Sequence, residues 1–272
     1  MPASILAEIA ERRRAAIRER KRVLGTELPP RPAAFGPARV GAFRRALARP
    51  DARTPVRLLC ELKKASPSKG LLRADFDIEA LARGDRDGGA AALSVLTEPE
   101  YFQGDATYLT RARAASRLPC LLKDFVIDAW QLDEALSLGA DGVLLIVALL
   151  PLERLESLVR QAHARGLDAL VEIHTEAELD LALEAGADLV GINNRDLGTF
   201  QVDPGITLAL RPRVPAGVTV VSESGIATAE DIARLSRAGV DAALIGEAFM
   251  REPDVAAAVR ALVDAASAAA AG

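Results

Sequence analysis

A short junction recurs along the chain: a glycine, one further residue, an aspartate and then an apolar run. A glycine can take the left-handed conformation that ends a helix, and each apolar run that follows is of strand type. One helix-to-strand turn used repeatedly predicts an alternating α/β architecture. The junctions are Gly139-Ala140-Asp141, Gly166-Leu167-Asp168, Gly186-Ala187-Asp188 and Gly239-Val240-Asp241, with a related form at Gly89-Ala90.

The apolar runs number eight, and they are continuous, as in parallel strands that are covered on both faces. Segments with helical spacing lie between them, at residues 132–138, 152–164, 177–185 and 232–238. Eight such units in 272 residues predict a closed (β/α)8 TIM barrel. An open doubly wound sheet is the alternative, but neither G-x-G-x-x-G nor a P-loop follows the first strand. The predicted strands are residues 56–63, 91–97, 119–124, 142–147, 168–174, 189–194, 218–223 and 242–246.

The first 50 residues differ from the rest of the chain. Ile5–Leu24 has the pattern of a basic amphipathic helix, and a proline-rich stretch follows it. We expect residues 1–50 to form an N-terminal helical extension packed on the barrel of residues 51–272. The arginines could bind an anionic partner, but a helix with a solvated basic face is the simpler interpretation.

Charge and cysteine content narrow the class of protein. The net charge of −4 does not favour nucleic acid as a partner. Cys60 and Cys120 lie in separate apolar runs without nearby histidines, which predicts buried thiols in a reducing compartment. The arginines follow the short apolar start, unlike a secretory signal, and the longest apolar stretch, residues 143–152, is too short to span a bilayer. We therefore expect a cytoplasmic protein with no membrane partner.

Charged side chains close several of the apolar strands. In a barrel of this kind the active site lies at the carboxyl ends of the strands. A period of two places Glu61 and Lys63 on one face, and buried charges cost several kcal/mol unless they are paired. Convergence at one barrel mouth would supply general acids and a base for an anionic substrate. The residues expected to converge are Glu61, Lys63, Lys123, Glu172 and Asn193, whereas helix capping or ion pairing explains Glu98, Asp124 and Asp196 at least as well.

A phosphate site is expected after strands seven and eight. Ser224-Gly225 and Gly246 stand there, and small residues let backbone N–H groups approach a phosphate. The loop from Ser66 to Gly70 carries hydroxyls and a cation and could close over the phosphate, although an ordinary surface turn is the alternative.

Other polar residues carry weaker signals. His163 is expected on a helix surface, His174 in a supporting role behind the site, and Trp130 in helix packing. No residues have metal-ligand spacing, so we expect no metal.

With these residues in these positions, the chain resembles the indole-3-glycerol phosphate synthase family. The resemblance runs from about residue 56 to the end and, more loosely, over the N-terminal helix. Its motifs are specific only together. They are Glu61-Leu-Lys-Lys-Ala-Ser-Pro-Ser-Lys-Gly70, Leu93-Ser-Val-Leu-Thr-Glu98, Tyr101-Phe-Gln-Gly104, Leu122-Lys-Asp-Phe125, Val171-Glu-Ile-His174, Gly191-Ile-Asn-Asn-Arg-Asp-Leu197, Ser222-Glu-Ser-Gly-Ile226 and Leu244-Ile-Gly-Glu247.

The resemblance implies ring closure, decarboxylation and dehydration of 1-(2-carboxyphenylamino)-1-deoxyribulose 5-phosphate, on the way to tryptophan. It implies that Lys123 is the general acid on the ketone oxygen and that Glu172 is the general base, held by Asn193. Lys63 would bind the anthranilate carboxylate and could act as an acid in dehydration, with Glu61 orienting the lysines. These steps are proton transfers, so no cofactor is expected.

The resemblance also implies the contacts of a small phosphorylated substrate. The catalytic Ser224 and the substrate-binding Glu223 would lie beside its hydroxyl and phosphate groups. The remaining residues would hold the phosphate (Ser66, Gly225, Gly246 and the backbone of Glu247), pack on the ring (Phe102, Phe125 and Leu144) or border the pocket (Arg195 and Leu197).

Two rivals remain, and two departures from the family are visible, one of which is the arginine-rich N-terminal helix, where lysines and mixed residues are common. An isomerase of the same pathway needs only an acid and a base, and a barrel that merely binds phosphorylated ligands needs neither. We expect a monomer or a weak homodimer. The helix after the first strand reads Leu81-Ala-Arg-Gly-Asp85, where the family usually has an aromatic residue near Asp85.

Overall fold

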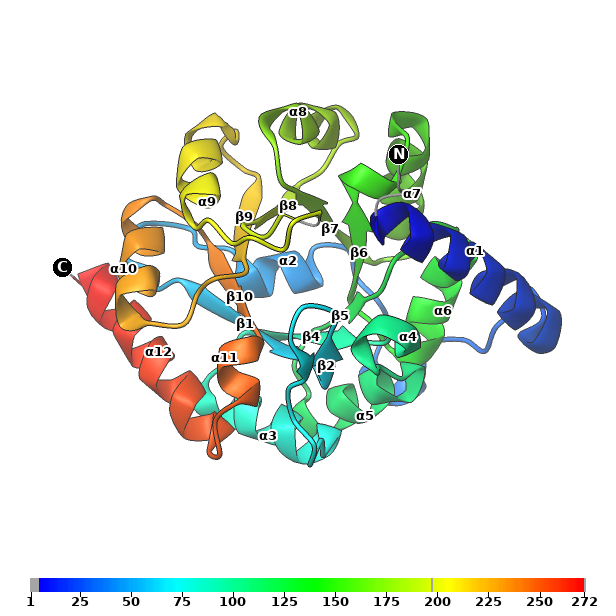
Figure 1. The fold of residues 1–272 in the computed structure, drawn as a ribbon, viewed down its shortest axis with the longest axis horizontal. Coiled ribbons are helices and arrows are strands. Elements are labelled where there is room, and N and C mark those ends of the chain that lie inside the picture. The colour runs from blue at the N-terminus through cyan, green and yellow to red at the C-terminus, as the bar shows by residue number, and fades with distance from the viewer. Residues whose placement is uncertain (1–4, 197, 272) are drawn as a thin grey trace.

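The structure is a computed structural model that describes residues 5–196 and 198–271. Eight parallel strands form a closed barrel in the order β1-β10-β9-β8-β7-β6-β5-β4 (Figure 1). The predicted barrel is confirmed, and each predicted strand boundary lies within one residue of the observed one. The strands are β1 (Arg57–Leu62), β4 (Ala92–Leu96), β5 (Cys120–Lys123), β6 (Gly142–Ile146), β7 (Asp168–Ile173), β8 (Leu189–Asn193), β9 (Thr219–Glu223) and β10 (Ala242–Ile245).

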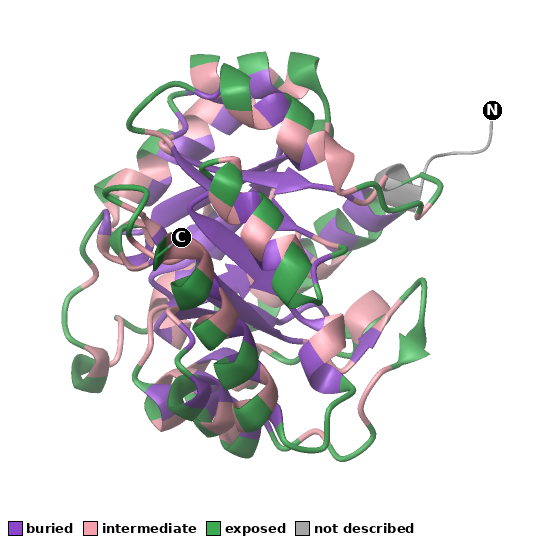
Figure 2. Cartoon of the chain, turned by 90° about the vertical axis from the view of Figure 1, so that its left-hand side faces the viewer, coloured by how far each residue is buried: buried purple, intermediate pink, exposed green. Residues whose placement is uncertain are grey.

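Helices surround the strands and bury one face against them, while their other face is exposed (Figures 1 and 2). Two of these helices begin with capping boxes, Thr175 with Glu178 at the start of α8 and Thr228 with Asp231 at the start of α10. The helices are α1 (Ile5–Leu24), α2 (Ala42–Leu47), α3 (Ile78–Gly88), α4 (Pro99–Phe102), α5 (Ala106–Ser116), α6 (Trp130–Leu138), α7 (Leu152–Ala164), α8 (Glu176–Glu184), α9 (Gly205–Leu210), α10 (Ala229–Arg237), α11 (Glu247–Met250) and α12 (Val255–Ala271), with short 3-10 turns at Ala33–Phe35, Val147–Leu149 and Arg211–Arg213.

The loop after β1 contains regular structure that the sequence does not predict. Ala65–Ser66 (β2) pairs antiparallel with Gly70–Leu71 (β3), so the segment is a small hairpin outside the barrel.

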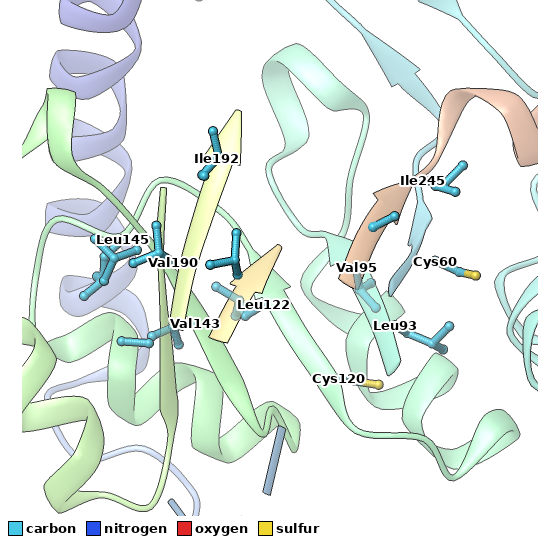
Figure 3. Packing of buried hydrophobic residues seen from close by; sticks show 14 of the residues in the cluster. Cys60, Leu93, Val95, Cys120, Leu122, Val143, Leu145, Val190, Ile192 and Ile245 are labelled. Atoms are coloured by element: carbon cyan, nitrogen blue, oxygen red, sulfur yellow. The ribbon is translucent and has the colours of Figure 1, made fainter. Parts of the chain in front are cut away.

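Alternate residues of each strand divide the core into two layers. The outer layer packs between strands and helices, and it includes Cys60 and Cys120, which are fully buried free thiols as predicted (Figure 3). The inner layer fills the barrel with residues such as Leu59 and Leu170. At the amino-terminal end of the strands, Phe43 and Leu47 of α2 extend this inner layer, and α2 contacts β1, β4, β7 and β9, so it closes that end of the barrel.

The aspartates of the recurring junctions bind the segment that precedes the barrel. Asp168 is fully buried and accepts hydrogen bonds from the backbone N–H groups of Gly41 and Arg44. Asp141 pairs with Arg31 at 2.7 Å, and Asp241 accepts the backbone N–H of Arg49 at 3.0 Å. The same turns that start the strands thus hold residues 31–49 across the closed end of the barrel.

Helix α1 lies at the edge of the barrel beside α6 (Figure 1). Arg20 pairs with Glu134 of α6, and Trp130 donates its indole N–H to the carbonyl of Gly25 at 3.1 Å. The main anchor is a buried ion pair between Arg13 and Asp124, 2.6 Å apart. Among the residues described above, no helix is long and apolar enough to cross a membrane.

We expect Arg13→Ala to destabilise the fold by about 3 kcal/mol, because the variant leaves the buried carboxylate of Asp124 without its counter-charge. Urea unfolding measures this loss. Arg14→Ala is the matched control, because Arg14 is half exposed and pairs with Glu11 of its own helix at 3.2 Å. Its expected effect is within about 0.5 kcal/mol. Equal losses in the two variants would contradict the anchoring role of Arg13.

Asp85 is a buried acid in the layer between the barrel and α3. It is 0% exposed, and the Cys60 thiol beside it is only a weak donor. Burial raises the pKa of Asp85 to about 8. In the unfolded chain an aspartate has a pKa of about 3.9, so the folded protein binds one more proton between these two values.

Because folding takes up this proton, the contribution of Asp85 to stability falls as the pH rises from about 4 to about 8. Asn carries no titrating proton, so we expect Asp85→Asn to be more stable than the parent chain at pH 8, by about 1–3 kcal/mol. The gain shrinks toward pH 5. Urea unfolding of both chains across this pH range measures the difference, and a difference that does not change with pH would show that Asp85 is not the titrating group.

Candidate active site

A cavity of about 660 Å³ opens at the carboxyl ends of the barrel strands. Every barrel strand contributes at least one residue to its lining, and Asn193 and Glu223 are the last residues of β8 and β9. Of the sixteen residues predicted for the site, fourteen line this cavity. They are Glu61, Lys63, Phe102, Lys123, Phe125, Leu144, Glu172, Asn193, Arg195, Glu223, Ser224, Gly225, Gly246 and Glu247.

The other two predicted residues are not found on the cavity wall. Ser66 belongs to the hairpin strand β2, and its neighbours Ser68 and Lys69 in the turn face the cavity instead. Leu197 lies outside the described residues.

The ammonium group of Lys123, on β5, lies between two carboxylates that come from β7 and β9. It is 2.7 Å from Glu223 Oε2 and 3.2 Å from Glu172 Oε2. Lys63 contacts Glu61 Oε1 at 2.5 Å. Period-two alternation in the strands puts all five side chains on the inner face. The sequence predicts the two lysines and two of the glutamates as a group; the third glutamate, Glu223, joins it through Lys123.

Mutual contact determines the charge states in this cluster. Burial alone would lower the pKa of Lys123, but the carboxylates of Glu223, Glu172 and Glu61 outweigh burial and hold that pKa above its ordinary value. Burial raises the pKa of Glu61, but the nearby Lys63 and Lys123 outweigh it and keep that pKa below its usual range. Burial raises the pKa of Glu223 to about 7, although Lys123 opposes the shift. Three carboxylates thus share two ammonium groups, and Glu223 is one that burial shifts toward protonation near neutral pH.

A chain of hydrogen bonds orients Glu172. Asn193 donates from Nδ2 to Glu172 Oε1 at 3.1 Å, and Asn193 Oδ1 accepts from the hydroxyl of Ser224 at 2.9 Å. Behind this chain, Nδ1 of His174 lies 2.7 Å from the carbonyl oxygen of Asn193. His174 thus supports the site from behind, as the sequence suggests.

The side of the cavity near β9 and β10 is suited to an anion. Ser224 and Gly225 are consecutive residues in the left-handed region, with φ of 67° and 76°. Successive backbone N–H groups in such turns form anion-binding concavities. Arg195, Lys69 and Arg251 line the same cavity, and Arg251 is 3.1 Å from Glu247.

The opposite side of the cavity is apolar. The rings of Phe102 and Phe125 lie 6.3 Å apart at 43°, and Leu144 and Ile146 of β6 line the cavity with them. A flat aromatic substrate ring fits beside such side chains.

Three acidic residues for which the sequence favours a capping or pairing role have that role. Glu98 accepts the first backbone N–H groups of α4, and Asp124 pairs with Arg13 and accepts the hydroxyl of Thr97 at 2.8 Å. Asp196 accepts backbone N–H groups from Gly198 and Thr199.

Phe200 and Arg251 are among the cavity residues that sequence reasoning missed. Phe200 lines the cavity from the turn after β8, with a left-handed φ of 60°, and no pattern in the sequence marks it. Arg251 could have been found, because it follows Glu247 by four residues and therefore shares its helix face.

Comparison with known proteins identifies the family. A family model described as indole-3-glycerol phosphate synthase matches residues 6–262. Indole-3-glycerol phosphate synthase from Campylobacter hominis is 43% identical over 94% of this chain and 98% of its own length. The protein of that name from Chromobacterium violaceum is 51% identical over 72% of this chain and 74% of its own length.

Similar solved structures agree on the fold. A 3-hexulose-6-phosphate synthase from Salmonella typhimurium superimposes with a TM-score of 0.61, over 77% of this chain and 98% of its own, at 17% identity. At that identity the likeness supports the barrel fold alone. The family match and the close relatives carry the assignment further: the chain belongs to the indole-3-glycerol phosphate synthase family.

Proposed function

We propose that the chain forms indole-3-glycerol phosphate from 1-(2-carboxyphenylamino)-1-deoxyribulose 5-phosphate, with loss of CO₂ and water, in tryptophan biosynthesis. The observation that carries the proposal is the lysine–glutamate cluster, which stands between an apolar wall and an anion-binding turn in one cavity. The apolar wall suits the aromatic ring, and the turn suits the phosphate.

In the first step the ring carbon that bears the carboxylate attacks the ketone carbon. Lys123 donates a proton to the ketone oxygen, which becomes a hydroxyl as the carbon–carbon bond forms. A proton can return to Lys123 from Glu223, 2.7 Å away, because the pKa of Glu223 near 7 leaves it partly protonated at neutral pH.

In the second step the carbon–carboxylate bond breaks, its electron pair restores the aromatic ring, and CO₂ leaves. Lys63 binds the carboxylate before this step, and Glu61, 2.5 Å from Lys63, orients its ammonium group. The apolar side chains of Phe102, Phe125 and Leu144 favour the loss of charge from the ring.

In the third step the new hydroxyl leaves as water. A lysine supplies the proton to the departing oxygen, and Glu172 removes a proton from the five-membered ring, so that a carbon–carbon double bond forms. Asn193 and Ser224 fix the direction of the Glu172 carboxylate through their hydrogen bonds.

The phosphate lies at the turns after β9 and β10 in this proposal. Backbone N–H groups of Gly225, Gly246 and Glu247 bind it, with Arg195 at the border of the pocket. Lys69 stands where Ser66 was expected, so the hairpin turn contributes its cation to this end of the cavity.

We also infer how the chain is organised and where it works. Residues 1–50 form an extension on the barrel of residues 51–272, supported by the buried pair of Arg13 with Asp124. The net charge of −4 and the buried free thiols favour a cytoplasmic enzyme without a nucleic-acid or membrane partner. A monomer or weak homodimer suits a cavity that a single chain encloses.

Incubating the protein with this substrate and following indole fluorescence tests the function directly. Fluorescence that grows in proportion to enzyme concentration supports the proposal. Turnover of a phosphoribosyl substrate by isomerisation alone, or binding of phosphorylated ligands without turnover, would replace it.

We expect Lys123→Met to lower kcat by about 10²–10⁴-fold, because the variant keeps the length of the side chain and removes the general acid. Steady-state kinetics by indole fluorescence measures the loss. Lys64→Met is the matched control: the neighbouring Lys64 does not line the cavity, so its kcat should stay within about twofold of the parent value. Near-normal turnover of Lys123→Met would remove Lys123 from this role.

We expect Glu172→Gln to lower kcat far more than it changes KM, because the amide keeps the shape of the side chain but cannot accept a proton. Glu176→Gln, on the exposed first turn of α8, serves as the control. The two constants are separated by varying substrate concentration. A rise in KM at unchanged kcat would contradict the assignment of Glu172 as the base.

A further inference from the structure

Gly191 lies on the inner face of β8, beside the carboxylates of the site. Its register partner on β7 is Glu172, and on β9 it pairs with Val221, two residues before Glu223. A Cβ atom built on Gly191 would lie 2.1 Å from Glu223 Oε1, far inside van der Waals contact. The carboxylate of Glu223 therefore occupies the space that any other side chain at position 191 would fill.

The position of that carboxylate is held from one side only. Oε2 contacts Lys123 at 2.7 Å, whereas Oε1 is buried and has no hydrogen-bond partner among the described residues. A buried carboxylate oxygen that accepts no hydrogen bond is energetically unfavourable. It keeps its position only where the surrounding atoms block other positions of the carboxylate. Because Gly191 has no side chain, the Glu223 carboxylate can occupy the space beside it and so reach Lys123.

We propose that Gly191 is a positioning residue, whose lack of a side chain sets the place of the Glu223 carboxylate and thereby its ion pair with Lys123. The effect on turnover rests on the proposed function, in which Lys123 is the general acid. The steric relation between Gly191 and Glu223 does not depend on it.

A second glycine stands in the same relation to another carboxylate. A Cβ atom on Gly246 of the turn after β10 would lie 2.8 Å from Glu61 Oε1 and 2.9 Å from Glu61 Cβ. Both glycines face a glutamate of a neighbouring strand. At two places on this end of the barrel, the lack of a side chain thus leaves room for a glutamate of a neighbouring strand.

Alanine at position 191 is a selective probe. The backbone of Gly191 is outside the left-handed region, so alanine introduces no backbone strain. After the atoms of the Glu223 carboxylate, the next nearest atom to the added Cβ is a methyl carbon of Leu170 at 3.3 Å, at the end of a flexible side chain. The substitution therefore acts on the Glu223 carboxylate, which has to move by about 1 Å or more to reach an ordinary contact distance.

The kinetic test compares Gly191→Ala with the parent chain. A displacement of about 1 Å in a catalytic ion pair can cost about 10²-fold in rate, so we expect kcat to fall by about 10–100-fold while KM stays within about threefold. In the parent chain we expect Glu223→Gln also to lower kcat, but in the Gly191→Ala background it should change kcat less than about twofold, because the pair is already broken.

Gly142→Ala is the matched control. Gly142 also faces the barrel interior, near the closed end, where an added Cβ would meet Phe43 and the carbonyl oxygen of Asp168 at 3.2 Å. That variant should lower the melting temperature and leave kcat within about twofold of the parent.

A stability measurement without substrate keeps this inference separate from the proposed function. Gly191→Ala should lower the melting temperature by about 3 °C or more. In a Glu223→Ala background the same substitution should have almost no effect, because the clashing carboxylate is gone. This result would stand even if the chain failed to form indole-3-glycerol phosphate.

Three results would overturn the inference. One is a kcat for Gly191→Ala within twofold of the parent value. Another is an equal effect of Gly191→Ala in chains with and without the Glu223 side chain, in kcat or in melting temperature. If Gly191→Ala does not fold, the double variant Gly191→Ala/Glu223→Ala decides: a folded double variant supports the steric relation, and an unfolded one refutes it.

Discussion

The ammonium group of Lys123 is held between the carboxylates of Glu223 and Glu172, and the arrangement of the site depends on that contact. Three glutamates and two lysines lie at the mouth of an otherwise apolar barrel, where an unpaired charge costs several kcal/mol. Each group is therefore stable only because the others are present. The five side chains come from β1, β5, β7 and β9 or directly follow them, so the closed barrel and its register fix their distances.

The two ends of the barrel use the same strands for different purposes. At the amino-terminal end, Asp168 and Asp241 bind the segment before the barrel, and α2 closes the interior with Phe43. At the carboxyl end, the inner side chains include the lysine–glutamate cluster and line the cavity. The amino-terminal end of the barrel is well packed. This packing allows the charged side chains at the carboxyl end, which repel and attract one another, to keep one arrangement.

Much of this could be predicted from the sequence, because the signals were local. Glycine turns marked the strand starts, and period-two alternation placed Glu61 and Lys63 on one inner face. Contacts between strands were harder, since no local pattern gives the register that brings Glu223 to Lys123. Loop geometry was also hidden: Ser66 was expected on the cavity wall, but the hairpin turns Lys69 toward it instead.

The charge balance of the cluster suits a substrate with two anionic ends. Three carboxylates against two ammonium groups leave one negative charge, which a proton on Glu223 can cancel, since its pKa lies near 7. Cations that face the cavity but stand outside the cluster, Arg195 and Arg251, lie on the side of the anion-binding turn. In the mechanism proposed above, Lys63 binds the carboxylate that is lost, and an anion weakly compensated in apolar surroundings is easily expelled as a neutral molecule.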